Sequence, residues 1–366
     1  MKTNKIIFAL AFASLLASCQ TPAVDSSIAA SSPAEESLSS AEASVSTPAE
    51  GTSSAAATSS QANSTPNSLD EGRTMRTDEL YTDSGFVVKF KAQGARIDKI
   101  TYGSGNKQIA KDGFTVGRVA NRIANGRFTL NGTTYNVTKN SGNHSLHGGG
   151  SSWQGPFATA NWTKAEQTAS TITYTYHSAA NESGYPGNLD ATVKYTLKNN
   201  GELTIDYTAV SDADTLYSPT NHLFMSLNGN SRDANHKLWI DADNYTPLSN
   251  QIPTGAISPV SGTKFDYTTE KNFSNNESYD DNYVLNGTGY RKVSTLTGTD
   301  LGVQVDVYTD RAGLQLYRDG SGNICLETQM FPDMINHPEW DQYGTTILRA
   351  NEEFHSKTTY AFSVIK

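Results

Sequence analysis

Hydrophobic and polar residues alternate with a period of two along several short stretches of the chain. Successive side chains of a strand point to opposite faces, so this alternation predicts β-strands with one buried face. The stretches are residues 172–176, 193–197, 203–207, 301–307 and 360–364. Asn199, Asn200 and Gly201 separate the second stretch from the third, and these residue types adopt the positive φ angles of hairpin turns. The pattern therefore predicts antiparallel pairing of neighbouring strands.

The whole segment 73–366 is predicted to be one all-β unit. A further hairpin is expected over residues 128–135, and no convincing helical period occurs after the N-terminal region. Short strands separated by turns are typical of a sandwich or a barrel. Because no Gly-, Pro- or Ser-rich linker and no internal repeat divides this segment, we expect one large antiparallel β-sandwich and not two domains.

The first 19 residues are predicted to be an export signal. Lys2 and Lys5 form a basic start, residues 6–16 are apolar or small, and residues 16–19 read Leu-Ala-Ser-Cys. This order is typical of a secretory signal peptide, and the apolar run is too short for a stable transmembrane helix. The ending resembles a bacterial lipobox, in which the cysteine thiol receives a lipid, so we expect Cys19 to be lipidated. The alternative is an ordinary signal peptide with an incidental cysteine.

Residues 20–72 have a different composition and are predicted to be a disordered tether. They are rich in Ser, Ala, Thr and Pro and contain no aromatic residue, no Lys and no Arg. Such a segment cannot bury enough apolar surface to offset its ordering entropy. The sequence thus predicts an exported protein that touches a membrane only through its N-terminal lipid.

The acidic charge of the chain excludes two classes of partner. The formal net charge is −9, whereas nucleic acids and anionic lipid surfaces require clustered Lys and Arg. Without the seven acids of the tether and the two lysines of the signal, 26 basic and 30 acidic residues remain, a net charge near −4. The acidity is therefore partly a property of the tether. The only two cysteines, Cys19 and Cys325, fall in different segments, so no disulfide framework is expected.

Polar side chains that can carry chemistry gather in a few turn-rich segments. These segments are residues 117–123, 143–149, 178–187, 218–222, 279–282 and 325–338.

Six motifs within and between these segments, taken in order, resemble the aldose 1-epimerase (galactose mutarotase) family. They are Gly-Arg-Val-Ala-Asn-Arg-Ile (117–123), Leu-His-Gly-Gly (146–149), Glu-Ser-Gly-Tyr-Pro-Gly-Asn-Leu (182–189), Thr-Asn-His (220–222), Ile-Pro-Thr-Gly (252–255) and Leu-Glu-Thr-Gln-x-x-Pro-Asp (326–333). The resemblance covers residues 80–366. The chain departs from the family's usual residues at 223–227 (Leu-Phe-Met-Ser-Leu), Asp281 and Met330, which bears on substrate preference.

The resemblance implies a β-supersandwich with a sugar cleft and no cofactor, and the residues themselves lead us to expect no metal site. It implies that the chain interconverts the α and β anomers of free aldohexoses such as glucose and galactose. In this reading Glu327 is the general base and His222 the general acid. The sugar-binding residues would be Asn121, Arg122, His147 and Asp280.

These residue types suit the chemistry of anomer exchange. Ring opening removes the proton of the C1 hydroxyl and adds one to the ring oxygen, and closure reverses both transfers. A carboxylate and an imidazole on opposite sides of the sugar are expected to do this. Asn, Arg, His and Asp side chains provide directed partners for the sugar hydroxyls.

Each candidate residue also has a structural interpretation. A glutamate in a strand is usually exposed, but Ile324, Cys325 and Leu326 before Glu327 indicate a buried strand. His144 and His147 have the spacing of a metal pair, yet no companion ligands accompany them, and His144 is expected to be incidental. Other structural alternatives are an ion-pair role for Arg118 and a turn cap for Asp280. Trp153 has two interpretations, a sugar-stacking platform or a core position.

Two other functions fit part of the pattern. One is a non-catalytic surface carbohydrate-binding protein on the same scaffold, which would not need both Glu327 and His222. The other is an epimerase of phosphorylated sugars, which would need several Arg or Lys in the cleft. Arg118 and Arg122 alone do not require a phosphate, and export disfavours a substrate held inside cells.

Overall fold

The computed structural model describes residues 69, 70, 72–229, 235–273 and 277–365. The chain divides into two units, residues 1–62 and 63–366, and every described residue belongs to the second. The predicted signal peptide, Cys19 and residues 20–68 of the predicted tether lie outside the described residues.

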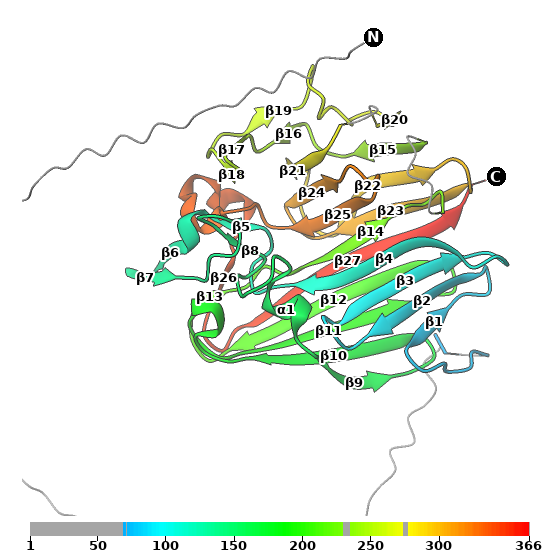
Figure 1. Ribbon diagram of the computed structural model, residues 1–366, viewed down its shortest axis with the longest axis horizontal. Helices are drawn as coiled ribbons and strands as arrows, with labels where there is room; N and C mark the ends of the chain where they lie inside the picture. The colour runs from blue at the N-terminus through cyan, green and yellow to red at the C-terminus, as the bar shows by residue number, and fades with distance from the viewer. Residues whose placement is uncertain (1–68, 71, 230–234, 274–276, 366) are drawn as a thin grey trace, which may run out of the picture. The chain divides into compact units, whose positions relative to one another are not determined.

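Two large antiparallel sheets form most of the described chain, which confirms the predicted all-β fold (Figure 1). The ten strands of the first sheet are, in spatial order, β1 (Glu79–Tyr81), β2 (Phe86–Lys91), β3 (Arg96–Tyr102), β4 (Lys107–Val116), β14 (Thr220–Met225), β25 (Ile324–Gln329), β24 (Gly313–Arg318), β21 (Tyr279–Val284), β16 (Asn244–Tyr245) and β19 (Ser258–Pro259). The nine strands of the second sheet are β20 (Lys271–Asn272), β15 (His236–Ile240), β22 (Arg291–Gly298), β23 (Val303–Thr309), β27 (Glu353–Val364), β12 (Glu202–Ser211), β11 (Leu189–Leu197), β10 (Thr171–Ser178) and β9 (Thr163–Gln167).

Smaller elements connect these strands. The two-stranded pairs are β5 (Arg122–Ile123) with β8 (Ser145–Leu146), β6 (Arg127–Leu130) with β7 (Thr133–Asn136), β13 (Thr215–Leu216) with β26 (Ile347–Leu348), and β17 (Leu248–Ser249) with β18 (Ile252–Pro253). The helices are α1 (Gly155–Thr159) and the 3-10 turns η1 (Ala124–Gly126), η2 (Glu182–Gly184), η3 (Met334–Asn336) and η4 (Pro338–Tyr343). None of the helices in the described ranges is long and apolar enough to cross a membrane.

The alternating stretches form strands as predicted. Strand β12 alternates buried and partly buried residues along most of its length, and its hairpin with β11 turns at 198–201. The hairpin expected over residues 128–135 is the β6–β7 pair, in which Leu130 opposes Thr133. One boundary differs, because β23 begins at Val303 and not at Leu301. Gly302, with φ of 61°, is part of the turn that precedes the strand.

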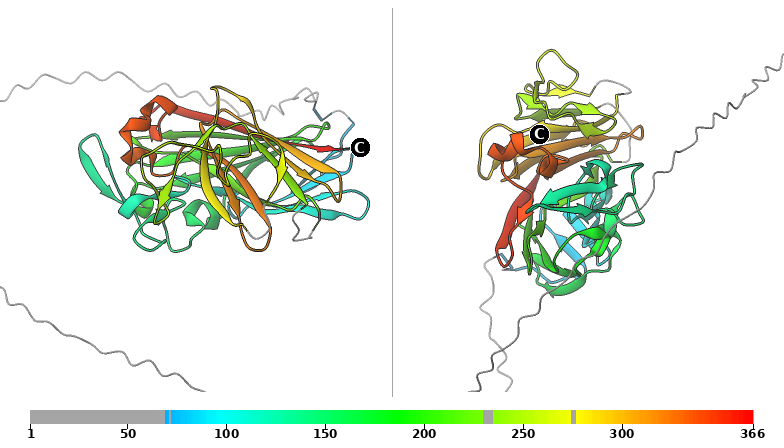
Figure 2. Two further views of the ribbon diagram at one scale, coloured as in Figure 1. Left: turned by 90° about the horizontal axis from the view of Figure 1, so that it is seen from above. Right: turned by 90° about the vertical axis from the view of Figure 1, so that its left-hand side faces the viewer.

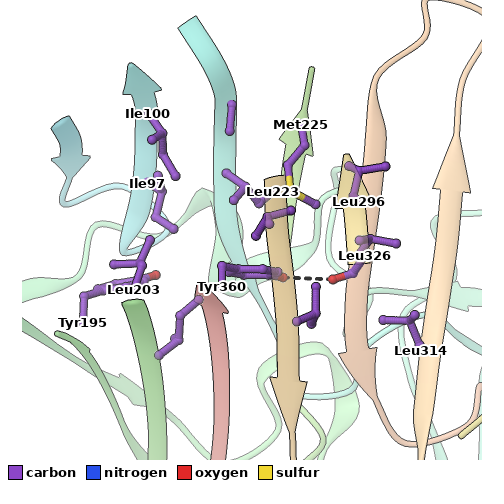
Figure 3. Packing of buried hydrophobic residues seen from close by; sticks show 14 of the residues in the cluster. Ile97, Ile100, Tyr195, Leu203, Leu223, Met225, Leu296, Leu314, Leu326 and Tyr360 are labelled. Atoms are coloured by element: carbon purple, nitrogen blue, oxygen red, sulfur yellow. Dashed lines mark hydrogen bonds between the residues drawn. The ribbon is translucent and has the colours of Figure 1, made fainter. Parts of the chain in front are cut away.

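One hydrophobic core fills the space between the two sheets. Seen from above, β27 (red) and the cyan strands of the first sheet lie on opposite sides of the unit (Figure 2). Ile97 and Leu223 of the first sheet and Leu203 of the second belong to the same buried cluster (Figure 3). Tyr360 of β27 donates a hydrogen bond of 2.9 Å to the carbonyl oxygen of Leu326 in β25. This contact between the layers fixes the height of β25 above the second sheet.

The middle strands of the first sheet are buried on both faces. All six residues of β25 are buried, and its apolar members Ile324 and Leu326 belong to the core. Because side chains alternate along a strand, Cys325, Glu327 and Gln329 point to the other face of the sheet. That outer face carries the polar groups described next.

Candidate active site

Strand pairing gathers polar side chains on the outer face of the first sheet. Gln315 of β24 lies directly opposite Glu327 of β25, and Tyr317 lies opposite Asp280 of β21. On the other side of β25, Met225 of β14 opposes Ile324. Three residues further along this antiparallel pair, His222 comes beside Glu327. Neighbouring strands, of which β14 and β25 are far apart in the sequence, thus build one polar surface.

A cavity of about 370 Å³ lies over this surface. It is lined by Asn121, Arg122, Leu146, His147, Trp153, His222, Asp280, Tyr317 and Glu327. The structure therefore brings all six residues predicted for catalysis and sugar binding to one cavity. Their individual roles stay predictions.

Glu327 is a buried carboxyl group with one unused oxygen. Its exposed fraction is 2%, and its Oε1 atom lies 3.5 Å from Nε2 of His222. Oε2 has no hydrogen-bond partner among the described residues. Burial, and secondarily the charge of Asp280, raises the pKa of Glu327 well above its usual range. The ionised form is consequently a stronger base than an exposed glutamate.

His222 is enclosed by aromatic rings. Its imidazole stacks on Phe114 with ring centroids 5.1 Å apart, and Phe224 and Tyr317 lie at 4.6 and 5.6 Å. Its Nδ1 atom is 3.4 Å from Sγ of Cys325. Burial lowers the pKa of His222 to about 4. Burial thus raises the pKa of Glu327 and lowers the pKa of His222. Both shifts favour the neutral form of the side chain.

Asn121 and His147 are held by reciprocal contacts between two loops. The backbone N–H of Asn121 donates to Nδ1 of His147 at 3.1 Å, and the backbone N–H of His147 donates to the carbonyl oxygen of Asn121 at 2.9 Å. Burial lowers the pKa of His147 well below its usual value, so the ring is neutral at pH 7. Because Nδ1 accepts a hydrogen bond, the ring proton is on Nε2, which is then a donor.

Arg122 and Asp280 form an ion pair at the same cavity. Nη1 of Arg122 lies 3.4 Å from Oδ2 of Asp280, and Nε2 of Gln315 donates to Oδ1 of Asp280 at 2.7 Å. The sequence interpretation missed Gln315 and Tyr317. Both lie on the outer face of β24, whereas Leu314 and Leu316 of the same strand face the core. The available signal in the sequence was a glutamine between two leucines, Leu314 and Leu316.

The structure resolves the alternative interpretations of four residues. Arg118 is structural, but it makes no ion pair within the described ranges, because its guanidinium donates to carbonyl and hydroxyl oxygens at 2.8–3.1 Å. His144 lies outside the cavity and accepts from the N–H of Asn125. Asp280 is in strand β21 and caps no turn. Trp153 is 48% exposed and lines the cavity, so it is not a core residue.

Among the described residues, the only group of three side chains that could hold a metal ion has two members in the cavity lining and contains neither His144 nor His147. It consists of His222, Cys325 and Glu327.

Comparisons with known proteins agree with this arrangement. A family model described as aldose 1-epimerase matches residues 79–361. The chain is 33% identical over 279 residues to an aldose 1-epimerase of Haemophilus influenzae, covering 68% of this chain and 80% of the relative. It is 31% identical over 349 residues to the Escherichia coli aldose 1-epimerase, covering 82% and 99%. The galactose mutarotase of Mus musculus is 35% identical over 278 residues, covering 69% and 79%.

A solved structure supports the fold. The crystal structure of a GalM/aldose epimerase homologue from C. elegans superposes with a TM-score of 0.72 and covers 79% of this chain and 98% of its own. The identity between the two sequences is 23%, so this likeness bears on the fold alone.

Proposed function

Because this chain belongs to the aldose 1-epimerase family and interconverts the α and β anomers of free aldoses, we propose that Glu327 and His222 perform this reaction on hexoses such as glucose and galactose. The observation that carries the proposal is the 3.5 Å contact between their side chains at the wall of one sugar-sized cavity. No other pair of groups lining this cavity within the described residues combines a buried carboxyl with a buried imidazole in contact.

The pair acts by passing two protons in opposite directions. Glu327 takes the proton of the C1 hydroxyl while His222 gives a proton to the ring oxygen, and the ring opens to the aldehyde. Rotation about the C1–C2 bond then presents the other face of the carbonyl. On closure the two groups exchange roles, so each turnover returns them to their starting states.

The position of the pair corrects one expectation from the sequence. The two groups lie side by side on neighbouring strands and not on opposite sides of the sugar. The oxygens that exchange protons, the C1 hydroxyl and the ring oxygen, are bonded to the same carbon atom. An acid and a base in contact with each other can therefore reach both.

The remaining polar groups suit neutral sugar hydroxyls. Arg122 is the only Lys or Arg among the described residues that line the cavity, and Asp280 balances its charge. A phosphate group would require more positive charge than this. His147 and Asp280 offer a donor and an acceptor at different points of the cavity. This arrangement favours unphosphorylated sugars.

The assignment is tested by following anomer equilibration of glucose and galactose in a polarimeter. Glu327→Gln keeps the shape of the side chain and removes the base, so the rate constant should fall by about 10²–10⁴-fold. Glu353→Gln changes an exposed glutamate of β27 that is not among the residues lining the described cavity, and it should leave the rate unchanged. A Glu327→Gln enzyme that equilibrates sugars at the native rate would contradict the assignment. A native protein that binds sugars without equilibrating them would instead support the non-catalytic alternative.

We further propose, from residues 1–72 alone, that the protein is exported and anchored to a membrane by a lipid on Cys19. The support is the order of basic start, apolar run and Leu-Ala-Ser-Cys, followed by a segment whose composition disfavours folding.

The anchor is tested by fractionating cells that express the full chain. The native protein should sediment with membranes and incorporate a radiolabelled fatty acid. Cys19→Ala should abolish the label and move the protein to a soluble fraction or halt its processing, whereas Ser26→Ala in the tether should change neither. Release of the native protein without any lipid would overturn the proposal.

A further inference from the structure

Three side chains with different ligand atoms converge beneath the sugar cavity. Cys325 and Glu327 are separated by one residue on β25 and therefore point to the same face of the sheet. His222 approaches them from the neighbouring strand β14. They supply a sulfur, a carboxylate oxygen and an imidazole nitrogen from two strands that are rigidly paired in the middle of the sheet.

The separations of these atoms resemble those around a tetrahedral metal ion. The Nδ1–Sγ distance from His222 to Cys325 is 3.4 Å, and the Nε2–Oε1 distance from His222 to Glu327 is 3.5 Å. One ligand atom from each residue can be chosen so that all three lie within 4.8 Å of one another. Zinc bonds of about 2.0–2.3 Å place neighbouring ligand atoms about 3.3–3.8 Å apart. The two contacts of His222 use different ring nitrogens, so a rotation of the imidazole that points one nitrogen toward both the sulfur and a carboxylate oxygen would complete this geometry.

A second, independent feature points to a missing ligand. Oε2 of Glu327 has no hydrogen-bond partner in the described chain, although the side chain is 98% buried. An unpaired buried carboxyl oxygen is costly, and a cation satisfies it. Glu327 also lines the cavity of about 370 Å³, which gives an ion a route of entry and leaves room for water at a fourth position.

We propose that His222, Cys325 and Glu327 bind one Zn²⁺ ion, or a similarly soft divalent ion, and that this ion inhibits the enzyme. The sulfur and nitrogen ligands favour zinc or cadmium over calcium and magnesium, which prefer oxygen ligands alone. Binding releases to the solvent both the thiol proton of Cys325 and the proton that Glu327 and His222 share, and the ion occupies the freed lone pairs of the three side chains. With both groups coordinated, no proton can pass to or from the sugar. Only the inhibition rests on the proposed function, because metal binding itself does not require it.

The first test measures binding without reference to activity. Full-length protein with Cys19→Ala retains Cys325 as its only thiol, since the chain has two cysteines. Titration with Cd²⁺ should produce an ultraviolet thiolate-to-metal absorption band that saturates at one ion per chain. With Zn²⁺, X-ray absorption spectroscopy of the same protein should show a single sulfur ligand at about 2.3 Å.

Variants then identify the ligands. In the Cys19→Ala background, Cys325→Ser should abolish the absorption band, and Glu327→Gln should weaken binding about tenfold or more. His144→Ala is the matched control, because this histidine lies outside the cavity, and it should bind Cd²⁺ as the parent does. If Cys325→Ser does not fold, judged by circular dichroism, the zinc–sulfur distance in the parent protein decides the question.

Kinetics separate this inference from the proposed function. Zn²⁺ should slow anomer equilibration of the parent enzyme, galactose should relieve the inhibition by competition, and a chelator should restore the full rate. The Cys325→Ser variant should need about tenfold more Zn²⁺ for the same fractional inhibition. Equal inhibition of both proteins, or the absence of a metal–sulfur bond, would overturn the metal site and leave the catalytic pair untouched. A bound metal with no effect on the rate would overturn the inhibition and the assignment of Glu327 and His222 together.

Discussion

At the scale of single residues, Glu327 and His222 behave as one titrating unit. Burial raises the pKa of Glu327 well above its usual range and lowers the pKa of His222 to about 4. Between about pH 4 and the raised pKa of Glu327, the pair holds a single proton. Either residue can hold this proton, because their side chains are in contact at 3.5 Å. The state with a carboxylate and an imidazolium is the one that can accept and donate protons at once. Burial on both faces of the sheet therefore sets the working pH range.

We predict a broad bell-shaped dependence of kcat/KM on pH. The acid limb should lie near pH 4, because below it the pair holds two protons and has no base. The alkaline limb should lie at the raised pKa of Glu327, because above it no proton is left for the ring oxygen. Initial rates from polarimetry across the pH range would reveal both limbs. In Glu327→Gln the alkaline limb should vanish from the residual activity, and its persistence would show that another group is responsible.

At the scale of elements, the segment 147–155 positions His147 through its glycines. Gly148 and Gly155 have φ angles of +85° and +81°. A Cβ atom on Gly148 would lie 2.1 Å from the carbonyl oxygen of Gly117, and one on Gly155 would lie 1.8 Å from that of His147. Only glycine allows this backbone contact. The loop is consequently pressed against the segment that carries Asn121.

We predict that Gly155→Ala impairs sugar binding through displacement of His147. The methyl group clashes with the His147 backbone, so KM should rise and the midpoint of thermal unfolding should fall. Gly132→Ala is the matched control, since its φ is +77° but no atom lies within 4 Å of the added Cβ. Gly132→Ala should lower stability by about 1 kcal/mol from backbone strain alone and leave KM unchanged. Equal KM values for the two variants would refute the positioning role of the loop.

At the scale of the whole molecule, the site is a source of instability within a well-packed sandwich. The cavity wall contains a carboxyl group whose folded-state pKa is raised above its unfolded value of 4.5. Above pH 4.5 the unfolded chain loses this proton while the folded protein retains it. The contribution of Glu327 to stability therefore decreases as pH rises from 4.5 toward its raised pKa. The hydrophobic core between the sheets must offset this cost.

We predict that Glu327→Gln removes this pH-dependent loss. Between pH 4.5 and the raised pKa of Glu327, the difference in free energy of unfolding between the variant and the native protein should grow in favour of the variant by about 1.4 kcal/mol per pH unit. Urea denaturation at several pH values would measure it. Glu353→Gln, at an exposed position, should show no such growth. A constant difference between Glu327→Gln and the native protein would mean that the carboxyl group is not buried in its neutral form.

Much of the fold was accessible from the sequence because strand periodicity is a local property. The alternation at 203–207 and the turn at Asn199–Gly201 gave the β11–β12 hairpin, whose register depends only on neighbouring residues. The motif resemblance named residues that the structure brings to one cavity. The start of β23 was placed two residues early, because a leucine in a turn continues the same alternation.

The sequence by itself determined the all-β class, the local hairpins and the residues that can perform acid–base chemistry, since these follow from periodicity and side-chain type. Only the tertiary structure decided that Glu327 and His222 stand side by side, that Gln315 holds Asp280, and that Cys325 joins the pair. Those contacts arise from the pairing of β14 with β25 and of β21 with β24, and long stretches of chain separate the partners of each pair. Non-local pairing leaves no local pattern, so burial, pKa shifts and the metal-like cluster emerge only once the sheet has formed.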